Sequence, residues 1–280
     1  MTKTSASQKI IVASDGSRTA RNAVDVAVQI ARAESLLVEG FYVVDEPLIM
    51  EPYTAYTKEL GSDHGVASRA NLIEWFEKRG TAVLDQLQEQ CASKEVPVIT
   101  EVLLGGIPEL ILDKAKQISF LALGRRGHTH ADETNYLGKN FRHIAHHAQI
   151  PLIVGGDTAR PLQRIFLVYD GSKQVDAALR LALQLNQALS ATLAVGVTEH
   201  SYLEDDFDAL VSRFSEGGIV KENIIDLRSK PAEKVVEAIH EHQSDLIVMG
   251  SYRHPEIMEW LVGGPNDQIL RQSPLPAVIA

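Results

Sequence analysis

The tripeptide Asp-Gly-Ser occurs twice in this 280-residue chain, each time directly after an apolar stretch. It occupies residues 15–17 after an apolar stretch that begins at Ile10, and residues 170–172 after one that begins at Ile165. A carboxylate at the end of a parallel strand can accept hydrogen bonds from a ribose hydroxyl or a base amine. The same triplet can also turn the chain and cap the next helix. The sequence leaves both roles open at each copy.

A glycine-bearing segment follows a later apolar stretch in both halves of the chain. The first reads LALGRRG and contains Gly124 and Gly127, and the second reads VMGSYRH and contains Gly250. Loop glycines let backbone N–H groups approach a phosphate, and the N-terminus of a following helix adds partial positive charge. These segments therefore predict phosphate binding near the aspartates.

The elements that must position these residues form an internal repeat. Residues 9–35 align without a gap with residues 164–190, and alanines at helical spacing coincide in the two copies. Each half alternates apolar, strand-length runs with amphipathic helical stretches. Such a pattern predicts two tandem Rossmann-like α/β domains, each an open, doubly wound parallel sheet.

We expect the domains to cover residues 1–155 and 164–280, with a turn-rich linker at 156–163. The second domain is shorter because it lacks roughly thirty residues of the long second helix that carries Leu72 and Cys91. The final strands, PLIVG at Pro151 and PAVIA at Pro276, can pair antiparallel within one chain and satisfy both exposed sheet edges. We therefore expect a monomer core with pseudo-two-fold symmetry.

Composition limits the classes of function. The formal net charge is −10 and no long Lys/Arg stripe occurs, which argues against nucleic-acid binding. No apolar run is long enough to span a bilayer, and the polar N-terminus shows no secretory signal, so we expect a cytoplasmic protein. Cys91 is the only cysteine, which excludes an internal disulfide, and it lies in the apolar register of its helix.

Together the strand-ending aspartate, the Ala-rich first helix, the G-x-P opening of the third helix, the glycine loop and the short P-x-x-V final strand resemble the universal stress protein family in its tandem form. The resemblance extends from about Lys9 to Ala280. It implies flavodoxin-like, nucleotide α-hydrolase-like domains that bind ATP or a related adenine nucleotide, with Mg²⁺ as a companion ion. Single-domain relatives commonly dimerise through their final strands, so the resemblance also leaves a homodimer open.

Neither half carries the family's complete ATP motif, which is a glycine, two residues, a glycine, nine residues, a glycine and then Ser or Thr. In the first half ten residues precede Gly138, and Lys139 and Asn140 follow it. In the second half Arg253 replaces a glycine, and Gly264 replaces the hydroxyl residue. Arg253 either blocks phosphate entry or supplies a cation in place of amide contacts.

The resemblance implies two unequal nucleotide sites. The first-half residues are Asp15, Val43, Gly124, Gly127, Gly138, Lys139 and Asn140, and the weaker second site would use Asp170, Val197, Gly250, Arg253, Gly263 and Gly264. The backbone of Val43, or of Val197 after a one-residue gap, would face adenine. Arg125, Arg126 and Lys139 are expected to add positive charge near the phosphates, although both arginines are also compatible with a solvated surface.

Other side-chain groups carry weaker signals. His143, His146 and His147 have a helical spacing that can hold a transition metal, but no carboxylate or cysteine completes the set, which favours an exposed helix edge. Trp75 and Phe76 fit packing or an interface better than a ligand platform. No Walker A sequence, nucleophile elbow or paired acid and base is present.

Three functions remain in order of preference. The first is a nucleotide-binding stress sensor or regulator, which is compatible with weak ATP hydrolysis but carries no catalytic signature. The second is a degenerate scaffold that binds protein partners without nucleotide. The third, an enzyme of the wider superfamily, is disfavoured by the missing catalytic residues.

Overall fold

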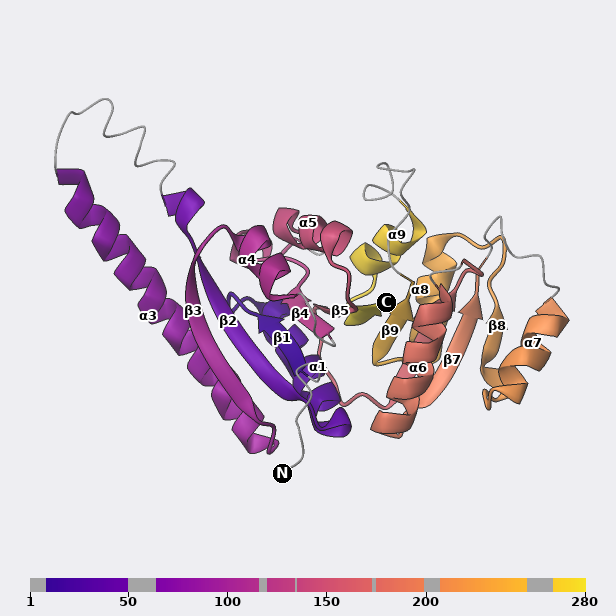
Figure 1. Ribbon diagram of the computed structural model, residues 1–280. Helices are drawn as coiled ribbons and strands as arrows, with labels where there is room; N and C mark the ends of the chain where they lie inside the picture. Colours follow the sequence, from indigo (N-terminus) through magenta and orange to yellow (C-terminus); the bar gives the residue numbers. More distant parts are fainter. Residues whose placement is uncertain are drawn as a thin grey trace.

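The structure is a computed structural model that describes residues 9–49, 64–115, 120–133, 135–172, 175–198, 207–250 and 264–280. Within these ranges, ten strands form one sheet in the order β3-β2-β1-β4-β5-β10-β9-β6-β7-β8 (Figure 1). Helices cover both faces of this sheet. Each half of the chain contributes five neighbouring strands, as the repeat predicts.

The elements of the first half match the expected strand–helix alternation. The strands are β1 (Lys9–Ala13), β2 (Leu37–Asp45), β3 (Val98–Gly105), β4 (Phe120–Gly124) and β5 (Leu152–Gly155). The helices are α1 (Arg18–Glu34), α3 (His64–Ser93), α4 (Ile107–Lys114) and α5 (Lys139–His147), with a 3₁₀ turn at His128–His130.

The second half repeats this order with one shortened element. Its strands are β6 (Arg164–Tyr169), β7 (Thr192–Val197), β8 (Ile224–Asp226), β9 (Leu246–Met249) and β10 (Ala277–Ile279). Its helices are α6 (Val175–Leu189), α7 (Phe207–Glu216), α8 (Ala232–Glu241) and α9 (Pro265–Gln272), with a 3₁₀ turn at Lys221–Asn223. Helix α3 has 30 residues and α7 has 10, so the length difference falls on the expected helix, although a separate helix at α7 was not predicted.

The two halves meet where β5 and β10 pair antiparallel, with Val154 opposite Ala277 and Leu152 opposite Ile279. Every other pair among the described strands is parallel. The predicted pairing of the two final strands is therefore confirmed. The segment expected to be a linker, residues 156–163, leads from β5 to β6 along this joint.

Two apolar layers hold the helices to the sheet. Side chains of α1, α3, α6 and α7 form one layer, and those of α4, α5, α8 and α9 form the other. Cys91 is fully buried in the first layer, as its register predicts, and burial raises the pKa of its thiol to about 11. Two buried layers are the expected consequence of strands that are apolar on both faces.

Small residues let α1 approach the sheet closely. A side chain at Gly155 would place its Cβ 1.8 Å from the carbonyl oxygen of Thr19, and one at Gly124 would lie 2.7 Å from the backbone nitrogen of Ala20. Both clashes are with α1 or its side chains, so larger residues at these strand ends would push the helix away. The glycine that ends β4 therefore has a packing role in addition to any ligand role.

Candidate functional site

Both Asp-Gly-Ser triplets form the same turn. Asp15 Oδ1 accepts a hydrogen bond from the Ser17 N–H at 2.9 Å, and Asp170 Oδ1 accepts one from Ser172 at 3.0 Å. The middle glycines, Gly16 and Gly171, have φ values of +77° and +73°, which other residues rarely adopt. The turn-forming role of the triplet is thus confirmed in both halves.

Each serine of the triplet also caps the next helix. Ser17 Oγ accepts from the backbone N–H of Ala20, and Ser172 Oγ accepts from that of Val175, both at 3.3 Å. An N-cap hydroxyl satisfies one of the free N–H groups of the first helical turn. The two halves therefore share one strand-to-helix connection, down to its hydrogen bonds.

A cavity of about 280 Å³ opens above the carboxyl ends of the first-half strands. Its lining includes all seven residues that the family resemblance implies for the first half, namely Asp15, Val43, Gly124, Gly127, Gly138, Lys139 and Asn140. Apolar side chains of β2, β4, α4 and α5 form the rest of its wall, including Phe41, Ile111 and Leu123. The cavity thus combines an apolar wall with polar groups from three loops.

Asp15 has one oxygen in the turn and one toward the glycine loop. Its Oδ1 holds the turn, whereas a Cβ added at Gly127 would lie 3.0 Å from Oδ2. A side chain at Gly127 would therefore crowd this oxygen. The arrangement leaves Oδ2 on the cavity side of the turn, where it can accept a hydrogen bond from a ligand.

The glycine loop is fixed against its neighbours. Ser17 Oγ and Thr19 Oγ1 both donate to the carbonyl oxygen of Arg126, at 3.2 Å and 2.7 Å. Gly138 N–H donates to the carbonyl oxygen of Arg125 at 2.8 Å. Gly138 is also the N-cap of α5 and offers no side chain as a cap, and the first residues of this helix, Lys139 and Asn140, line the cavity. Free N–H groups at a helix start favour an anion.

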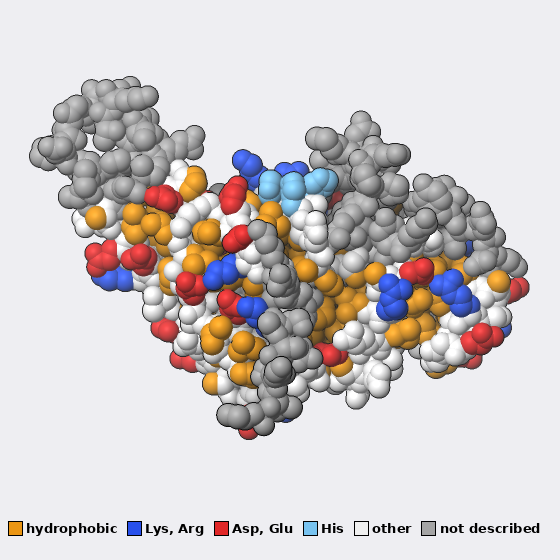
Figure 2. Space-filling model, in the orientation of Figure 1, with side chains coloured by type: hydrophobic (Ala, Val, Ile, Leu, Met, Phe, Trp, Pro, Cys, Tyr) orange, Lys and Arg blue, Asp and Glu red, His pale blue; other side chains and the backbone are white. Residues whose placement is uncertain are grey.

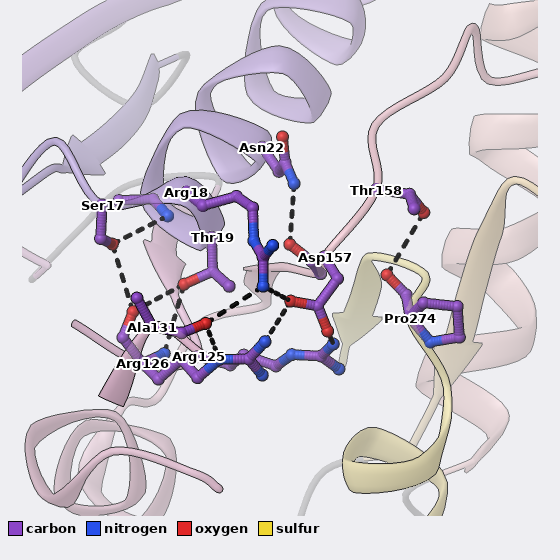
Figure 3. Close-up of polar contacts among 12 residues, drawn as sticks. Ser17, Arg18, Thr19, Asn22, Arg125, Arg126, Ala131, Asp157, Thr158 and Pro274 are labelled. Carbon is purple, nitrogen blue, oxygen red and sulfur yellow. Dashed lines mark hydrogen bonds and ion pairs between the residues drawn. The ribbon is translucent and has the colours of Figure 1, made fainter. Parts of the chain in front are cut away.

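Neither Arg125 nor Arg126 is the solvated surface residue that the sequence also allowed, although Arg126 lines the cavity. Their side chains are 1% and 0% exposed, and both donate to the carboxylate of Asp157 (Figure 3). Arg125 also donates to the carbonyl oxygens of Leu270 and Ser273, the latter at 2.7 Å. The expectation failed because Asp157, about thirty residues further along the chain, offers the arginines a buried partner.

The sequence alignment placed Val197 one position out of register. Ala13 pairs with Phe41 in the first half, and Val168, its equivalent by the Asp-Gly-Ser repeat, pairs with Gly196. The equivalent of Val43 is therefore Thr198, the residue after β7. Because side chains alternate along a strand, Val197 packs in the opposite apolar layer from Val43.

The remaining second-half residues are only partly brought together. Asp170 holds its turn, Gly250 follows the end of β9, and Gly264 is the N-cap of α9. Arg253 and Gly263 lie outside the described residues.

The strand ends of the two halves differ in opposite directions at equivalent positions. Ala13 corresponds to Val168, which is larger, and Leu123 corresponds to Met249, which is similar in size; Val168 and Met249 are 4% and 0% exposed. Phe41 corresponds to Gly196, where the ring of Phe166 lies so close that an added Cβ would be 2.7 Å from it. The end of β6 is therefore bulkier than the end of β1, whereas β7 is less bulky than β2 at this level.

Thr129, His130 and Tyr136 also line the cavity and were not among the predicted site residues. The rings of His130 and Tyr136 stack with their centroids 4.0 Å apart, and His130 Nδ1 lies 2.8 Å from Glu133 Oε1. They lie between the second and third glycines of the loop, in the interval that is one residue longer than the family motif. That extra length was the only sequence signal for them.

The histidines of α5 form no metal site with the other described residues. His143 and His147 stack with ring centroids 4.3 Å apart, and Figure 2 shows histidine side chains gathered on the surface over α5. Across the described ranges, no group of three or more His, Cys, Asp or Glu residues is arranged to hold a metal ion. His143, His146 and His147 are all exposed, as the exposed-edge interpretation predicts.

The comparisons with known proteins agree with this architecture. The sequence model of the Universal stress protein family matches residues 6–154 and 196–280. The chain belongs to the universal stress protein family. Two matched segments in one chain correspond to the tandem form.

Individual relatives are distant, and they cover different shares of the chain. The universal stress protein Slr1230 of Synechocystis sp. is 21% identical over 216 residues, 75% of this chain and 74% of the relative. A universal stress protein of Thermus aquaticus is 27% identical over 131 residues, 41% of this chain and 96% of its own length.

Among solved structures, a universal stress protein from Archaeoglobus fulgidus has a TM-score of 0.73 at 18% identity, covering 98% of this chain and 96% of that one. A putative universal stress protein from Pseudomonas aeruginosa has a TM-score of 0.67 at 15% identity, with 98% and 93% covered. These structures support the fold of the whole chain. Among the described helices, none is long and apolar enough to cross a membrane.

Proposed function

We propose that this universal stress protein binds ATP or a related adenine nucleotide in the first-half cavity and acts as a cytoplasmic stress sensor or regulator. The observation that carries the proposal is the convergence of all seven expected residues on one cavity. These residues come from four separate segments of the chain, so a shared cavity is not a consequence of their spacing in sequence.

Each part of the cavity suits one part of a nucleotide. The apolar wall near Val43 and Ile111 would take the adenine, with the backbone of Val43 beside the base. Asp15 Oδ2 would accept from the ribose hydroxyls. The N–H groups of the Gly124–Gly138 loop and of the start of α5, with the Lys139 ammonium, would bind the phosphates.

The cavity fits a companion Mg²⁺ only if the phosphates supply most of its ligands. Asp15 is the single carboxylate among the described residues that line the cavity. Mg²⁺ commonly uses one or two carboxylates together with phosphate oxygens and water, so this donor set is sufficient. The ion would neutralise phosphate charge, and this chain would contribute Asp15 to its shell.

The alternative function, a scaffold for protein partners without nucleotide, is favoured by the departures from the family's ATP motif at Lys139 and Asn140. Lys139 stands where the motif has Ser or Thr after the third glycine, and Asn140 follows it. The two functions differ in one measurable property, which is nucleotide affinity.

Calorimetric titration of ATP into the parent protein, Asp15→Asn and Asp170→Asn tests the proposal. Asparagine keeps the oxygen that accepts from the serine N–H, so both turns survive while one charge is removed. Loss of a charged hydrogen bond costs about 1.5–3 kcal/mol, so Asp15→Asn should weaken binding by roughly one to two decades.

Asp170→Asn is the matched control and should change ATP affinity by less than about twofold, because its turn lies in the other half. The opposite result, with Asp170→Asn weakening and Asp15→Asn neutral, would reverse the assignment of the halves. A folded parent that binds neither ATP nor any related adenine nucleotide would leave the scaffold function in its place.

A further inference from the structure

Arg125, Arg271 and Asp157 connect the cavity loop of the first half with the second half of the chain. Asp157 lies just after β5, and its carboxylate accepts from Arg18, Arg125 and Arg126 (Figure 3). Its side chain is only 15% exposed, and its backbone N–H donates to the carbonyl oxygen of Pro274 at 2.7 Å. One carboxylate thus connects α1 and the glycine loop with the segment between α9 and β10.

Arg125 makes the connection from the first half outward. It belongs to the glycine loop, and its guanidinium donates to the carbonyl oxygens of Leu270 and Ser273 at the C-terminal end of α9. Carbonyl groups at a helix end lack partners within the helix and carry partial negative charge, so a guanidinium is stabilising there. The backbone of Arg125 in turn accepts from Gly138 N–H, the cap of α5.

Arg271 makes a second connection, from the second half inward. Its Nη1 donates to the carbonyl oxygen of Asn135 at 2.6 Å, and its Nε donates to Asp267 at 2.7 Å. Asn135 directly precedes Tyr136, which lines the cavity. Helix α9 therefore holds the loop at two places, one on each side of the 3₁₀ turn at His128–His130.

Arg126 links this network to the cavity electrostatically. It lines the cavity on one side and pairs with Asp157 on the other. Three guanidinium groups face the carboxylate of Asp157 here, and burial lowers the pKa of Arg125. An anion in the cavity would add a negative charge beside Arg126. Occupancy of the cavity and the packing of α9 therefore act on the same group of charges.

From these contacts we infer that the second half is a positioning element for the first-half site: Asp157 and the C-terminal end of α9 hold the Gly124–Gly138 loop in its binding shape, and nucleotide affinity depends on them. This inference rests on the proposed function. It assigns the shorter half a role that does not require a nucleotide of its own. Coupling between two sites is reciprocal, so nucleotide would also stabilise the end of α9.

The test compares Arg271→Ala with Arg213→Ala. Arg213 is also an arginine of the second half, but its contacts with Asp176 and Tyr169 stay within that half. We expect Arg271→Ala to raise the Kd for ATP about fivefold, and Arg213→Ala to leave the Kd within about twofold. Because Arg271 also pairs with the buried Asp267, Arg271→Ala should lower the melting temperature as well, so the titration is run well below it. Arg125→Met should raise the Kd further.

Hydrogen exchange gives a readout that does not depend on ligand charge. In the ligand-free protein, Arg271→Ala should speed exchange at Tyr136 and Gly138, and Arg213→Ala should not. In the parent, saturating ATP should slow exchange at residues 270–275. Should Arg125→Met fail to fold, Arg271→Ala still decides the matter.

The outcomes separate this inference from the proposed function. A parent that binds ATP, together with Arg271→Ala that changes neither Kd nor exchange of the loop, overturns the inference and leaves the function standing. A parent that binds no nucleotide overturns the function. In that case faster loop exchange in Arg271→Ala alone would still support positioning of the loop by α9, and unchanged exchange would refute it.

Discussion

The same turn follows the first strand in both halves of the sheet, but the residues around it differ. Each has a left-handed glycine, an aspartate that holds the turn and a serine that caps the following helix. Around Asp15 the strand ends line a cavity, with the small Ala13 at the end of β1. Around Asp170 they carry Val168 and Met249, both buried.

The comparison teaches that the Asp-Gly-Ser triplet is needed first for the connection between strand and helix. The same hydrogen bonds persist in the half that departs further from the family's nucleotide motif. Ligand capacity is decided by neighbouring residues, namely those at the strand ends and those beyond the glycine loop. A triplet repeated within one chain is therefore a fold signal before it is a binding signal.

Removing a charge at the joint between the halves should lower the free energy of unfolding far more than removing one from the surface of the second half. Asp157→Ala leaves two fully buried arginines without their carboxylate, and removing one partner of a buried pair costs about 3–5 kcal/mol. Asp176→Ala removes an ion pair whose side chains are about half exposed, which is worth about 0–1 kcal/mol. Urea denaturation measures both free energies of unfolding, and equal losses would contradict the contrast.

Exchanging the strand-end residues should make the two halves more alike in their properties. Ala13→Val copies the second half into the cavity wall and should weaken ATP binding about tenfold by occupying ligand volume. Val168→Ala removes two methyl groups at a buried position and should lower the free energy of unfolding by about 2 kcal/mol. Calorimetry and denaturation of both variants check this. Unchanged ATP affinity in Ala13→Val would show that the ligand does not reach the end of β1.

Two aspartates, one in each half, should change the free energy of unfolding in opposite directions as the pH falls. Burial raises the pKa of Asp25 above its ordinary 3.8, against a hydrogen bond from Gln90 and the charge of Lys94. Hydrogen bonds from Arg228 lower the pKa of Asp226. Asp25 therefore contributes stability below pH 3.8 that is lost as the pH rises through its raised pKa. Asp226 contributes stability above pH 3.8 that is lost as the pH falls through its lowered pKa.

Asp25→Asn should accordingly raise the free energy of unfolding at pH 7 by up to about 1 kcal/mol and leave it unchanged at pH 3. Asp226→Asn should lower it at pH 7 by well under 1 kcal/mol, because that pair is exposed, and by less at pH 3. Denaturation at the two pH values measures both. Effects of the same sign would show that the two carboxyl groups do not differ as described.

Much of the architecture was predictable because strands and helices leave apolar patterns in short stretches of sequence, and these patterns recur in both halves. The strand runs, the alanine face of α1 and the pairing of the two final strands follow from apolar period and from the need to satisfy sheet edges. The register of β7 was missed because Val43 and Val197 are both valines next to a similar apolar run. A one-residue slip changes the face of a strand without changing its composition.

The role of the two arginines was not predictable from their neighbours. Nothing near Arg125 in sequence indicates that Leu270 and Ser273 will be its acceptors, because these lie about 145 residues away and approach only once β5 and β10 pair. Asp157 was within a segment that we expected to be a linker. Hydrogen-bond partners that come together only where the two repeats meet leave no pattern in the local sequence.

The position of β10 also sets an order of events during synthesis. It is the last of these ten strands to be synthesised, yet it lies in the middle of the sheet that they form, as the C-terminal mark in Figure 1 shows. Until Ala277–Ile279 is made, β5 and β9 each have an open, apolar edge that can pair with a neighbouring nascent chain. Each newly made molecule is thus prone to aggregate through these edges until β10 enters the sheet.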